Sequence, residues 1–494
     1  MDYISTRNKE LKVNSSQAIL QGISMEGGLF VPKSLPLIED LDILMDMDYR
    51  EIALYILEKF FPQLGRDNLQ KAVNMAYDTK FTHKEIVDIK TVMGVNFLEL
   101  FHGPTLAFKD MALSLLPHLL KISKEIEEID KEIVILTATS GDTGKAALEG
   151  FVDVEGIKII VFFPEEGVSR VQRLQMITQE GENTFVVGIK GNFDEAQSGV
   201  KAIFNDEKFK EDLKKDDYIL SSANSINIGR LIPQIVYYFY SYCELVRREE
   251  IEKGEKINIV VPTGNFGNIL AAYYGKHMGL PINKLICASN NNNVLTEFFD
   301  QGKYDKRREL VLTSSPSMDI LISSNLERLL FHLTGEDEEL IKDKMKELSE
   351  KGQYEILDLD TSEFYSNYAD EKEVTRSIRD VFMEGDYLID PHTAVAYSVY
   401  KKYKEDSKDG TKTIIASTAS PFKFGEKVAS SIGIDTRGKN EILILEELAE
   451  KTGIDIPDNI KSLKDKAIVH KNISTKEDMK NMIEEFLKVG EIYG

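Results

Sequence analysis

Apolar runs of strand length alternate with helix-forming segments through the middle of the chain. Residues 133–136 form an apolar, β-branched run, which is followed by a glycine-bearing turn and then by helix formers at 145–148. The cycle repeats with a strand at 157–163 closed by Pro164, a helix at 169–179 with Ser169 as N-cap, a strand at 185–187 and a helix at 194–204. Apolar strands without polar alternation, separated by helices, predict a parallel sheet covered on both faces.

A second cycle of the same kind begins after a long apolar segment. Residues 226–246 predict a helix, and the charged stretch 247–256 predicts a solvated link between two domains. The cycle then comprises a strand at 257–261, a loop at 262–268, a helix at 269–277 and a strand at 285–288. Charged residues at helical spacing around 335–380, and again after about 440, predict solvated helices.

Together the two cycles predict an α/β fold of two doubly wound α/β domains. We expect an N-terminal subdomain over 1–96, a smaller α/β domain over 97–250, and a larger α/β domain with a helical insertion over 251–494. These borders are open by many residues, because the first α/β unit can borrow strands from the N-terminal region.

Composition and charge exclude several classes of protein. The 494 residues, 42% of them hydrophobic, suffice for a large core, and 61 basic against 83 acidic residues give a net charge of −22. This charge opposes unspecific binding to nucleic acid or anionic membranes, so an anionic ligand needs a local site. Cys243 and Cys287 are the only cysteines, which excludes a disulfide framework and a multi-cysteine metal site. The N-terminus resembles no signal peptide and no apolar run is long enough to span a bilayer, so we expect a cytoplasmic protein.

Four segments with turn residues follow apolar runs or introduce helices. Their residues are 102–110, 140–144, 263–268 and 417–421. In a doubly wound sheet such loops gather at the carboxyl ends of the strands, where ligands bind, so the four segments can share one cleft.

The loop at 263–268 has the features of an anion site. Glycines let the backbone approach an anion, while free N–H groups and the dipole of the following helix point at it. The alternative is a glycine turn that only caps a helix. The loop lacks the Gly-Lys-Ser/Thr ending of a nucleotide P-loop and the Gly-x-Gly-x-x-Gly of a dinucleotide fold, so nucleotides are poor candidates for its ligand.

The other two loops carry candidate catalytic and substrate groups. Ser140, Thr143 and nearby N–H groups suit an amino-acid carboxylate, although Ser140 or Asp142 can equally be a helix N-cap. Lys109 follows a rigid Gly-Pro turn and two apolar residues, which favours a buried position. Burial lowers the pKa of an amine and makes it a nucleophile toward an aldehyde and a proton carrier, whereas the alternative is a surface charge.

Several ordered segments resemble threonine synthase, a family of pyridoxal-phosphate enzymes with the fold of the tryptophan synthase β subunit (fold type II). The resemblance covers most of the chain. Its segments are Tyr3-Ile4-Ser5-Thr6-Arg7, residues 21–32, 99–105, Lys109-Asp110, 140–144, 222–227, 264–267, 390–396 and the segment around Thr418. The chain departs from the common pattern at Asn268, where the family commonly has Asp, and at Ser420, where it has His.

The resemblance implies a site for pyridoxal 5′-phosphate and no metal. It implies that Lys109 is the catalytic residue and carries the cofactor as a Schiff base, and that the cofactor phosphate lies against Gly264, Asn265, Phe266, Gly267 and Asn268. It places the Thr418 hydroxyl at the pyridine nitrogen. The expected substrate-binding residues are Thr105, Ser140, Asp142, Thr143, Asn224, Ser225 and Arg230. For His392 a structural role is expected in preference to acid–base chemistry.

By the same resemblance, the reaction is conversion of O-phospho-L-homoserine and water to L-threonine and phosphate, in a monomer or homodimer. A threonine-synthase-like phospho-lyase, which eliminates phosphate and yields a keto acid, is the first alternative. A non-catalytic binding protein on the same scaffold is the second, and an intact Lys109 with both anion loops argues against it.

Overall fold

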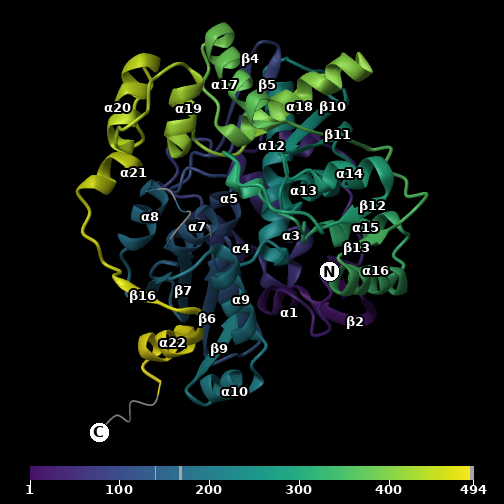
Figure 1. Ribbon diagram of the computed structural model, residues 1–494. Helices are drawn as coiled ribbons and strands as arrows, with labels where there is room; N and C mark the ends of the chain where they lie inside the picture. The colour runs from purple at the N-terminus through teal and green to yellow at the C-terminus, as the bar shows by residue number, and fades with distance from the viewer. Residues whose placement is uncertain (140, 166–167, 169, 490–494) are drawn as a thin grey trace.

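Two β-sheets form the centre of the molecule in the computed structural model, which describes residues 1–139, 141–165, 168 and 170–489. The larger sheet has six strands in the order β14-β11-β10-β15-β5-β4. Its strands are β14 (Phe364–Tyr368), β11 (Ile282–Ser289), β10 (Ile257–Pro262), β15 (Thr413–Ser417), β5 (Val95–Glu99) and β4 (Asp88–Val92). All neighbours are parallel except β4 and β5, and helices lie around the sheet (Figure 1).

The smaller sheet has five parallel strands in the order β16-β8-β7-β6-β9. Its strands are β16 (Asn472–Ser474), β8 (Thr184–Ile189), β7 (Ile157–Pro164), β6 (Glu132–Ala138) and β9 (Tyr218–Ser221). Helices α7 (Asp142–Phe151), α8 (Arg170–Ile177) and α9 (Phe193–Phe204) alternate with these strands along the chain. The apolar strands are buried, as a parallel sheet covered on both faces requires. The predicted fold of two α/β units is confirmed.

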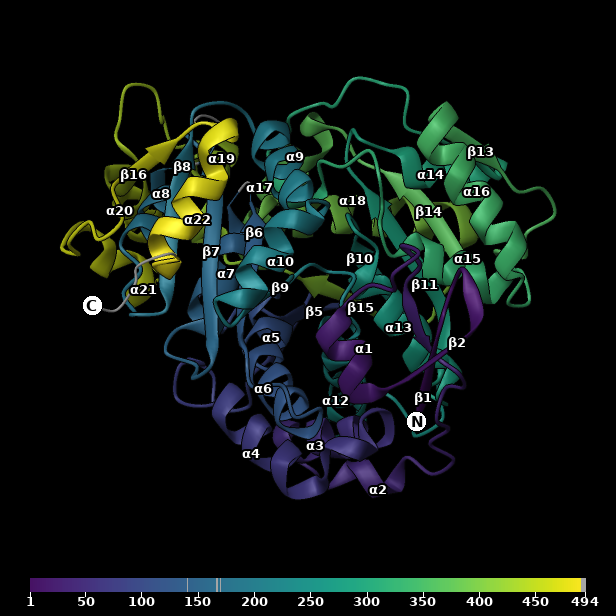
Figure 2. The same ribbon diagram turned by 90° about the horizontal axis from the view of Figure 1, so that it is seen from below.

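Neither sheet is built from one continuous part of the chain. β5 comes before the smaller sheet in sequence but pairs with β15 of the larger one, and β16 lies near the C-terminus but pairs with β8. Figure 2 shows the C-terminal segment, with α22 (Met479–Leu487), beside the smaller sheet and α9. The domain borders at 96/97 and 250/251 stay predictions.

An N-terminal antiparallel sheet, β2-β1-β3, precedes a group of helices. It consists of β2 (Asn8–Asn14), β1 (Asp2–Ser5) and β3 (Phe30–Pro32), and it is followed by α3 (Tyr49–Phe60) and α4 (Arg66–Ala76). Helix α3 packs on α12 (Pro233–Arg247), whose aromatic side chains are buried in the main core.

Two predictions from the hydrophobic pattern are wrong in detail. The helix expected over 226–246 is divided into α11 (Ile228–Leu231) and α12, because Pro233 at the start of α12 has no N–H to continue the α11 hydrogen bonds. The charged region 335–380 is not wholly helical. Between α16 (Glu338–Lys351) and α17 (Glu371–Gly385) it contains β13 (Gln353–Glu355), which pairs with β12 (Lys303–Asp305), and the edge strand β14. An edge strand with one neighbour tolerates such polar residues. The expected N-cap Ser169 lies outside the described residues.

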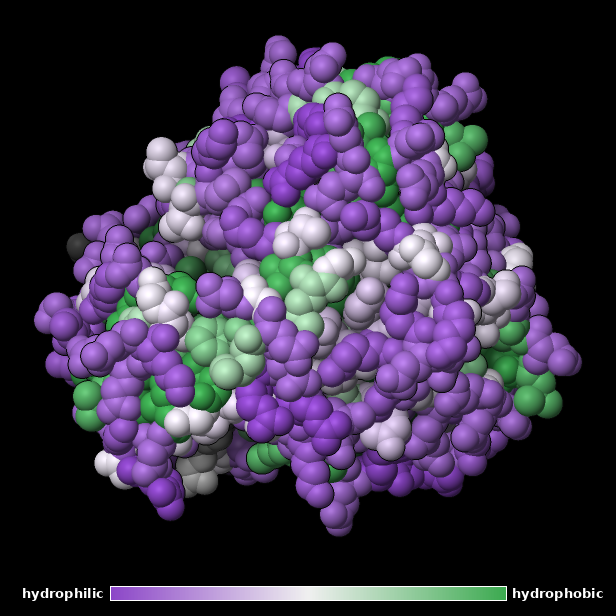
Figure 3. All heavy atoms as spheres, turned by 90° about the horizontal axis from the view of Figure 1, so that it is seen from above, coloured by the Kyte–Doolittle hydropathy of each residue, from purple (hydrophilic) through white to green (hydrophobic). Residues whose placement is uncertain are grey.

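The face of the molecule seen in Figure 3 is mostly hydrophilic, with smaller hydrophobic areas between the polar ones. In the described part of the chain, no helix combines the length and apolar character that crossing a bilayer requires.

Candidate active site

Lys109 lies at the start of α5 (Asp110–Leu113), in a loop that is paired with the end of β15. The N–H of Phe108 donates to the carbonyl of Thr418 at 2.9 Å, and the N–H of Ser420 donates to the carbonyl of Leu106 at 3.0 Å. This pairing brings two of the four predicted loops together and holds the lysine side chain inside the protein, where it is 9% exposed.

The Lys109 amine contacts one hydroxyl and one carboxylate. Its Nζ donates to Ser317 Oγ at 3.0 Å and lies 3.6 Å from Asp142 Oδ2. Burial lowers the pKa of the amine, and the positive charges of Lys423 and Arg230 lower it further, while Asp142 opposes them. A larger fraction of this amine is therefore neutral at a given pH than of a lysine in solvent.

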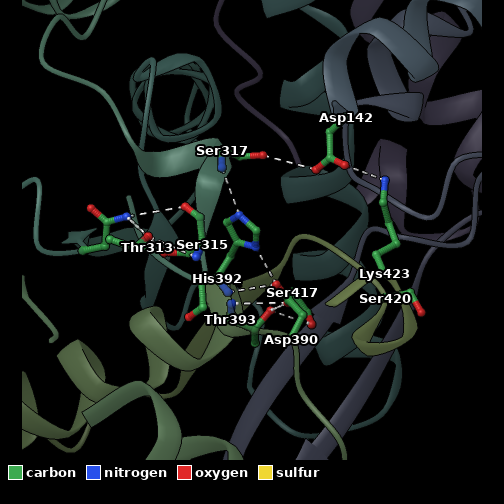
Figure 4. Close-up of polar contacts among 12 residues, drawn as sticks. Asp142, Thr313, Ser315, Ser317, Asp390, His392, Thr393, Ser417, Ser420 and Lys423 are labelled. Carbon is green, nitrogen blue, oxygen red and sulfur yellow. Dashed lines mark hydrogen bonds and ion pairs between the residues drawn. The ribbon is translucent and has the colours of Figure 1, made fainter. Parts of the chain in front are cut away.

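Asp142, the first residue of α7, forms a buried ion pair with Lys423 (Figure 4). Lys423 Nζ lies 2.8 Å from Asp142 Oδ1, and Gln172 Nε2 donates to the same oxygen at 3.0 Å. The other oxygen accepts from Ser317 Oγ at 3.2 Å. Burial alone would raise the pKa of this carboxyl, but Lys423 and Lys109 outweigh it and hold the pKa far below its usual range. Asp142 is therefore an anion.

Ser317 belongs to a loop that is held by His392, as Figure 4 shows. The Ser317 N–H donates to His392 Nε2 at 3.3 Å, and His392 Nδ1 lies 2.8 Å from Asp390 Oδ1. The carboxylate partner assigns the ring proton to Nδ1, which leaves Nε2 as the acceptor. The same loop is braced from its other side by hydrogen bonds among Thr313, Ser315, Asn290 and Asp319.

The predicted anion loop joins β10 to α13 (Gly267–His277). Phe266, the residue before the helix, has a left-handed backbone with φ of 63°. Within the described chain, no protein acceptor pairs with the backbone N–H of residues 264–268. A Cβ on Gly264 would lie 2.5 Å from the carbonyl oxygen of Ser317, so a glycine is required where the two loops cross. The loop thus combines free amides with a helix N-terminus, which is the arrangement that binds a phosphate.

The two departures from the family pattern have contacts of their own. Asn268 Oδ1 accepts from the hydroxyls of Tyr237, at 2.9 Å, and Tyr238, while its Nδ2 is buried without a protein partner. Ser420 caps the short 3₁₀ helix Pro421–Phe424 that carries Lys423.

The predicted substrate residues lie in three places. Thr105 is buried and donates to Asp110 through its N–H, at 2.8 Å, and its hydroxyl, at 2.6 Å. Thr143, in the first turn of α7, is half-buried, whereas Ser140 lies outside the described residues. Asn224 is exposed and Ser225 half-buried in the turn before α11, which carries Arg230.

Arg230 is buried and incompletely paired. Its Nη1 donates to the Ala223 carbonyl at 2.7 Å, and its Nε has no hydrogen-bond partner in the described structure. Burial lowers the pKa of the guanidinium to about 10, so the group is cationic at neutral pH. Thr418, at the end of β15, is 5% exposed.

Three family models match successive parts of the chain. The model "Threonine synthase N terminus" matches residues 2–77, "Pyridoxal-phosphate dependent enzyme" matches 94–418 and "Threonine synthase, C-terminal" matches 393–473. Threonine synthase of Schizosaccharomyces pombe is 35% identical over 464 residues, which cover 87% of this chain and 88% of that protein. The chain belongs to the threonine synthase family.

Solved threonine synthases share the fold. The pyridoxal-phosphate-bound enzyme from Brucella melitensis has a TM-score of 0.87 at 33% identity, and the yeast enzyme has 0.88 at 30%, each with 99% of both chains covered. Human "Threonine synthase-like 1" is 39% identical over 457 residues, but the chain spans only 61% of its length. Pyridoxal phosphate is the cofactor of this family of enzymes, and the residues of this chain fit it. A buried amine and a loop of unpaired amides are present in one site, as this ligand requires.

Three residues of the candidate active site were not identified from the sequence: Ser317, Lys423 and Gln172. Ser317 lies in a segment without glycine and without helical or strand periodicity, so no pattern marks it. Lys423 is two residues beyond the segment 417–421, and Gln172 lies within a predicted helix. The nearness of Lys423 to a predicted loop is the only signal that points to any of them.

Proposed function

We propose that this protein is a threonine synthase, which converts O-phospho-L-homoserine and water to L-threonine and phosphate with pyridoxal phosphate attached to Lys109. One observation carries the proposal. The buried Lys109 amine contacts Ser317, whose carbonyl lies against Gly264 of the loop with unpaired amides. A nucleophilic amine and a phosphate cradle are thus held together through one residue.

When bound, pyridoxal phosphate supplies an electron sink that acidifies the hydrogens on the α- and β-carbons of an attached amino acid. The amides of 264–268 would hold the phosphate of this cofactor, and the Thr418 hydroxyl would face its ring nitrogen. Lys109 Nζ, released when the substrate takes its place, would then move protons between the α- and β-carbons, as base and afterwards as acid. Its lowered pKa suits this work near neutral pH.

The substrate carries an amino-acid end and a phosphate end, which need separate groups. We assign the amino-acid end to Thr105, Ser140 and Thr143, and the phosphate end to Asn224, Ser225 and Arg230. The unpaired, buried Nε of Arg230 supports this assignment, because a charged donor without a partner gains most from an anion. Closure of one α/β unit on the other would exclude stray water while the β-hydroxyl is formed.

The proposed function also implies the partners of the protein and its location in the cell. We expect a small-molecule substrate, a monomer or homodimer, and neither nucleic acid nor membrane as a partner. The two cysteines, Cys243 and Cys287, are both free and buried, which supports a reducing, cytoplasmic location.

A phospho-lyase is the second candidate function, because the animal relatives are named threonine synthase-like. One assay separates the two. Purified protein is incubated with O-phospho-L-homoserine, and phosphate, L-threonine and keto acid are measured together. Threonine synthase activity gives threonine and phosphate in equal amounts, whereas keto acid in place of threonine establishes the lyase and overturns the proposal.

A further inference from the structure

The Asp142 carboxylate lies between two buried lysines that make different contacts with it. Lys423 Nζ is 2.8 Å from Oδ1, whereas Lys109 Nζ is 3.6 Å from Oδ2 and reaches it also through Ser317 Oγ. Asp142 is thus engaged by protein groups on both oxygens, and its nearer cation is Lys423.

We propose that Lys423 is a positioning residue of the active site: it fixes the Asp142 carboxylate and balances its charge, so that Asp142 orients the Lys109 amine through Ser317 without holding it as an ammonium ion. This inference rests on the proposed function, in which Lys109 must be free to give and take protons.

Lys423 contacts both Asp142 and the loop that carries Lys109. Its side chain is fully buried, and its ammonium group also donates to the Thr105 carbonyl at 2.8 Å. Thr105 in turn is hydrogen-bonded to Asp110, the residue next to Lys109. One side chain therefore ties the α7 N-terminus to the loop that carries the catalytic lysine.

Charge explains why a second lysine is needed. An isolated carboxylate this close to Lys109 would favour its protonated form and remove the base that catalysis requires. The other ionisable groups near the pair are Arg230 from α11, which also opposes protonation of Lys109, Asp110 from α5, and His392 from α18 (Pro391–Ser407). Lys423 is the partner of Asp142 that bears a full positive charge and lies within direct hydrogen-bond distance of it.

The Ser317 hydroxyl links Lys109 to Asp142 through two hydrogen bonds. It accepts from Lys109 and donates to Asp142, so the amine has one defined orientation. Asp142 does not act as a proton acceptor in this arrangement, because the charge of Lys423 keeps it ionised.

The test uses the holoenzyme and the variants Lys423→Gln, Asp142→Asn, the double variant and Lys423→Arg. The pH dependence of the visible absorbance of the bound cofactor reports protonation of the Lys109 nitrogen to which it is attached. We expect the midpoint to rise by about one pH unit in Lys423→Gln, to fall in Asp142→Asn, and to return near the wild-type value in the double variant. Lys423→Arg keeps the charge and should stay near wild type.

Lys342→Gln removes one exposed lysine that pairs with Glu339 on α16, and it controls for a change in net charge. A midpoint in Lys423→Gln that matches the wild type overturns the inference. If that variant does not fold, an unchanged midpoint in Asp142→Asn overturns it equally. A wild-type protein without any visible band would instead contradict the proposed function itself, so the two failures are distinguishable.

Discussion

His392 Nε2 accepts a hydrogen bond from the backbone N–H of Ser317 at 3.3 Å, and the same Ser317 contacts the Lys109 amine through its hydroxyl. A buried histidine that does not touch Lys109 directly thus determines where a neighbour of the catalytic lysine lies. Its carboxylate partner, Asp390, fixes the ring so that Nε2 is available as an acceptor. The structural role expected for His392 is therefore to hold the backbone of Ser317 in place.

Replacing His392 by Leu should lower kcat about tenfold or more. The change leaves the Ser317 N–H without an acceptor in a partly buried place, which costs about 1 kcal/mol or more and allows the loop to move away from Lys109. Steady-state kinetics measure the effect, and His277→Leu, at an exposed histidine that pairs with Glu363, is the control. Wild-type kcat in His392→Leu would contradict this role.

Gly264→Ala should weaken cofactor binding about tenfold or more. The new Cβ would lie 2.5 Å from the Ser317 carbonyl oxygen, so either the phosphate loop or the Ser317 loop must shift. Titration of protein freed of cofactor with pyridoxal phosphate measures the Kd. Gly410→Ala is a matched control, because a Cβ there meets no atom within 4 Å. Equal Kd values for the two variants would show that the crossing of the loops is not tight.

Arg230→Lys should raise the KM for O-phospho-L-homoserine about tenfold, with a smaller effect on kcat. Lysine keeps the charge but loses the planar donors, including the Nε that has no protein partner. Arg379→Lys, at an exposed position on α17, serves as the control. If KM does not change, Arg230 does not bind the substrate phosphate.

We expect the free energy of unfolding to depend on pH through the Asp110 carboxyl. Burial raises its pKa to about 6, against the opposing hydrogen bonds from Thr105. Because the folded-state pKa lies above the unfolded value of about 4, the stabilisation is complete below pH ~4 and is lost as pH rises through about 6. It amounts to about 3 kcal/mol at most.

Asp110→Asn removes this dependence. The Tm of the wild type relative to Asp110→Asn should therefore fall by about 1–2 °C between pH 5 and pH 7.5. Thermal unfolding at several pH values measures it, with Asp343→Asn on the exposed face of α16 as a control. A difference that is constant with pH would mean that Asp110 does not titrate in this range.

Much of the fold could be predicted from the sequence because buried parallel strands have a distinct pattern. The strands predicted at 133–136, 157–163, 185–187 and 257–261 correspond to β6, β7, β8 and β10. The partners of β5 and β16 could not be predicted, because pairing across hundreds of residues leaves no local signal. β14 is partly polar, and its place at the sheet edge is determined by tertiary contacts.

For the site, the sequence indicated the segments and not the contacts between side chains. Lys109 and the loop 263–268 were found because glycine and proline turns mark them. Ser317 and Lys423 have no such mark, and their roles depend on the approach of loops that are more than 100 residues apart in the chain. For Asp142 the resemblance predicts a contact with the substrate, whereas its oxygens contact Lys423, Gln172 and Ser317.

The attachment of pyridoxal phosphate to Lys109 can be measured directly. The purified protein is loaded with the cofactor, reduced with borohydride, digested and examined by mass spectrometry, which locates the lysine that has gained the cofactor mass. Attachment at Lys109 predicts one stoichiometric label on Lys109 and none in Lys109→Ala. A label on another buried lysine, such as Lys145 or Lys423, or no label under conditions where the protein binds the cofactor, would contradict it.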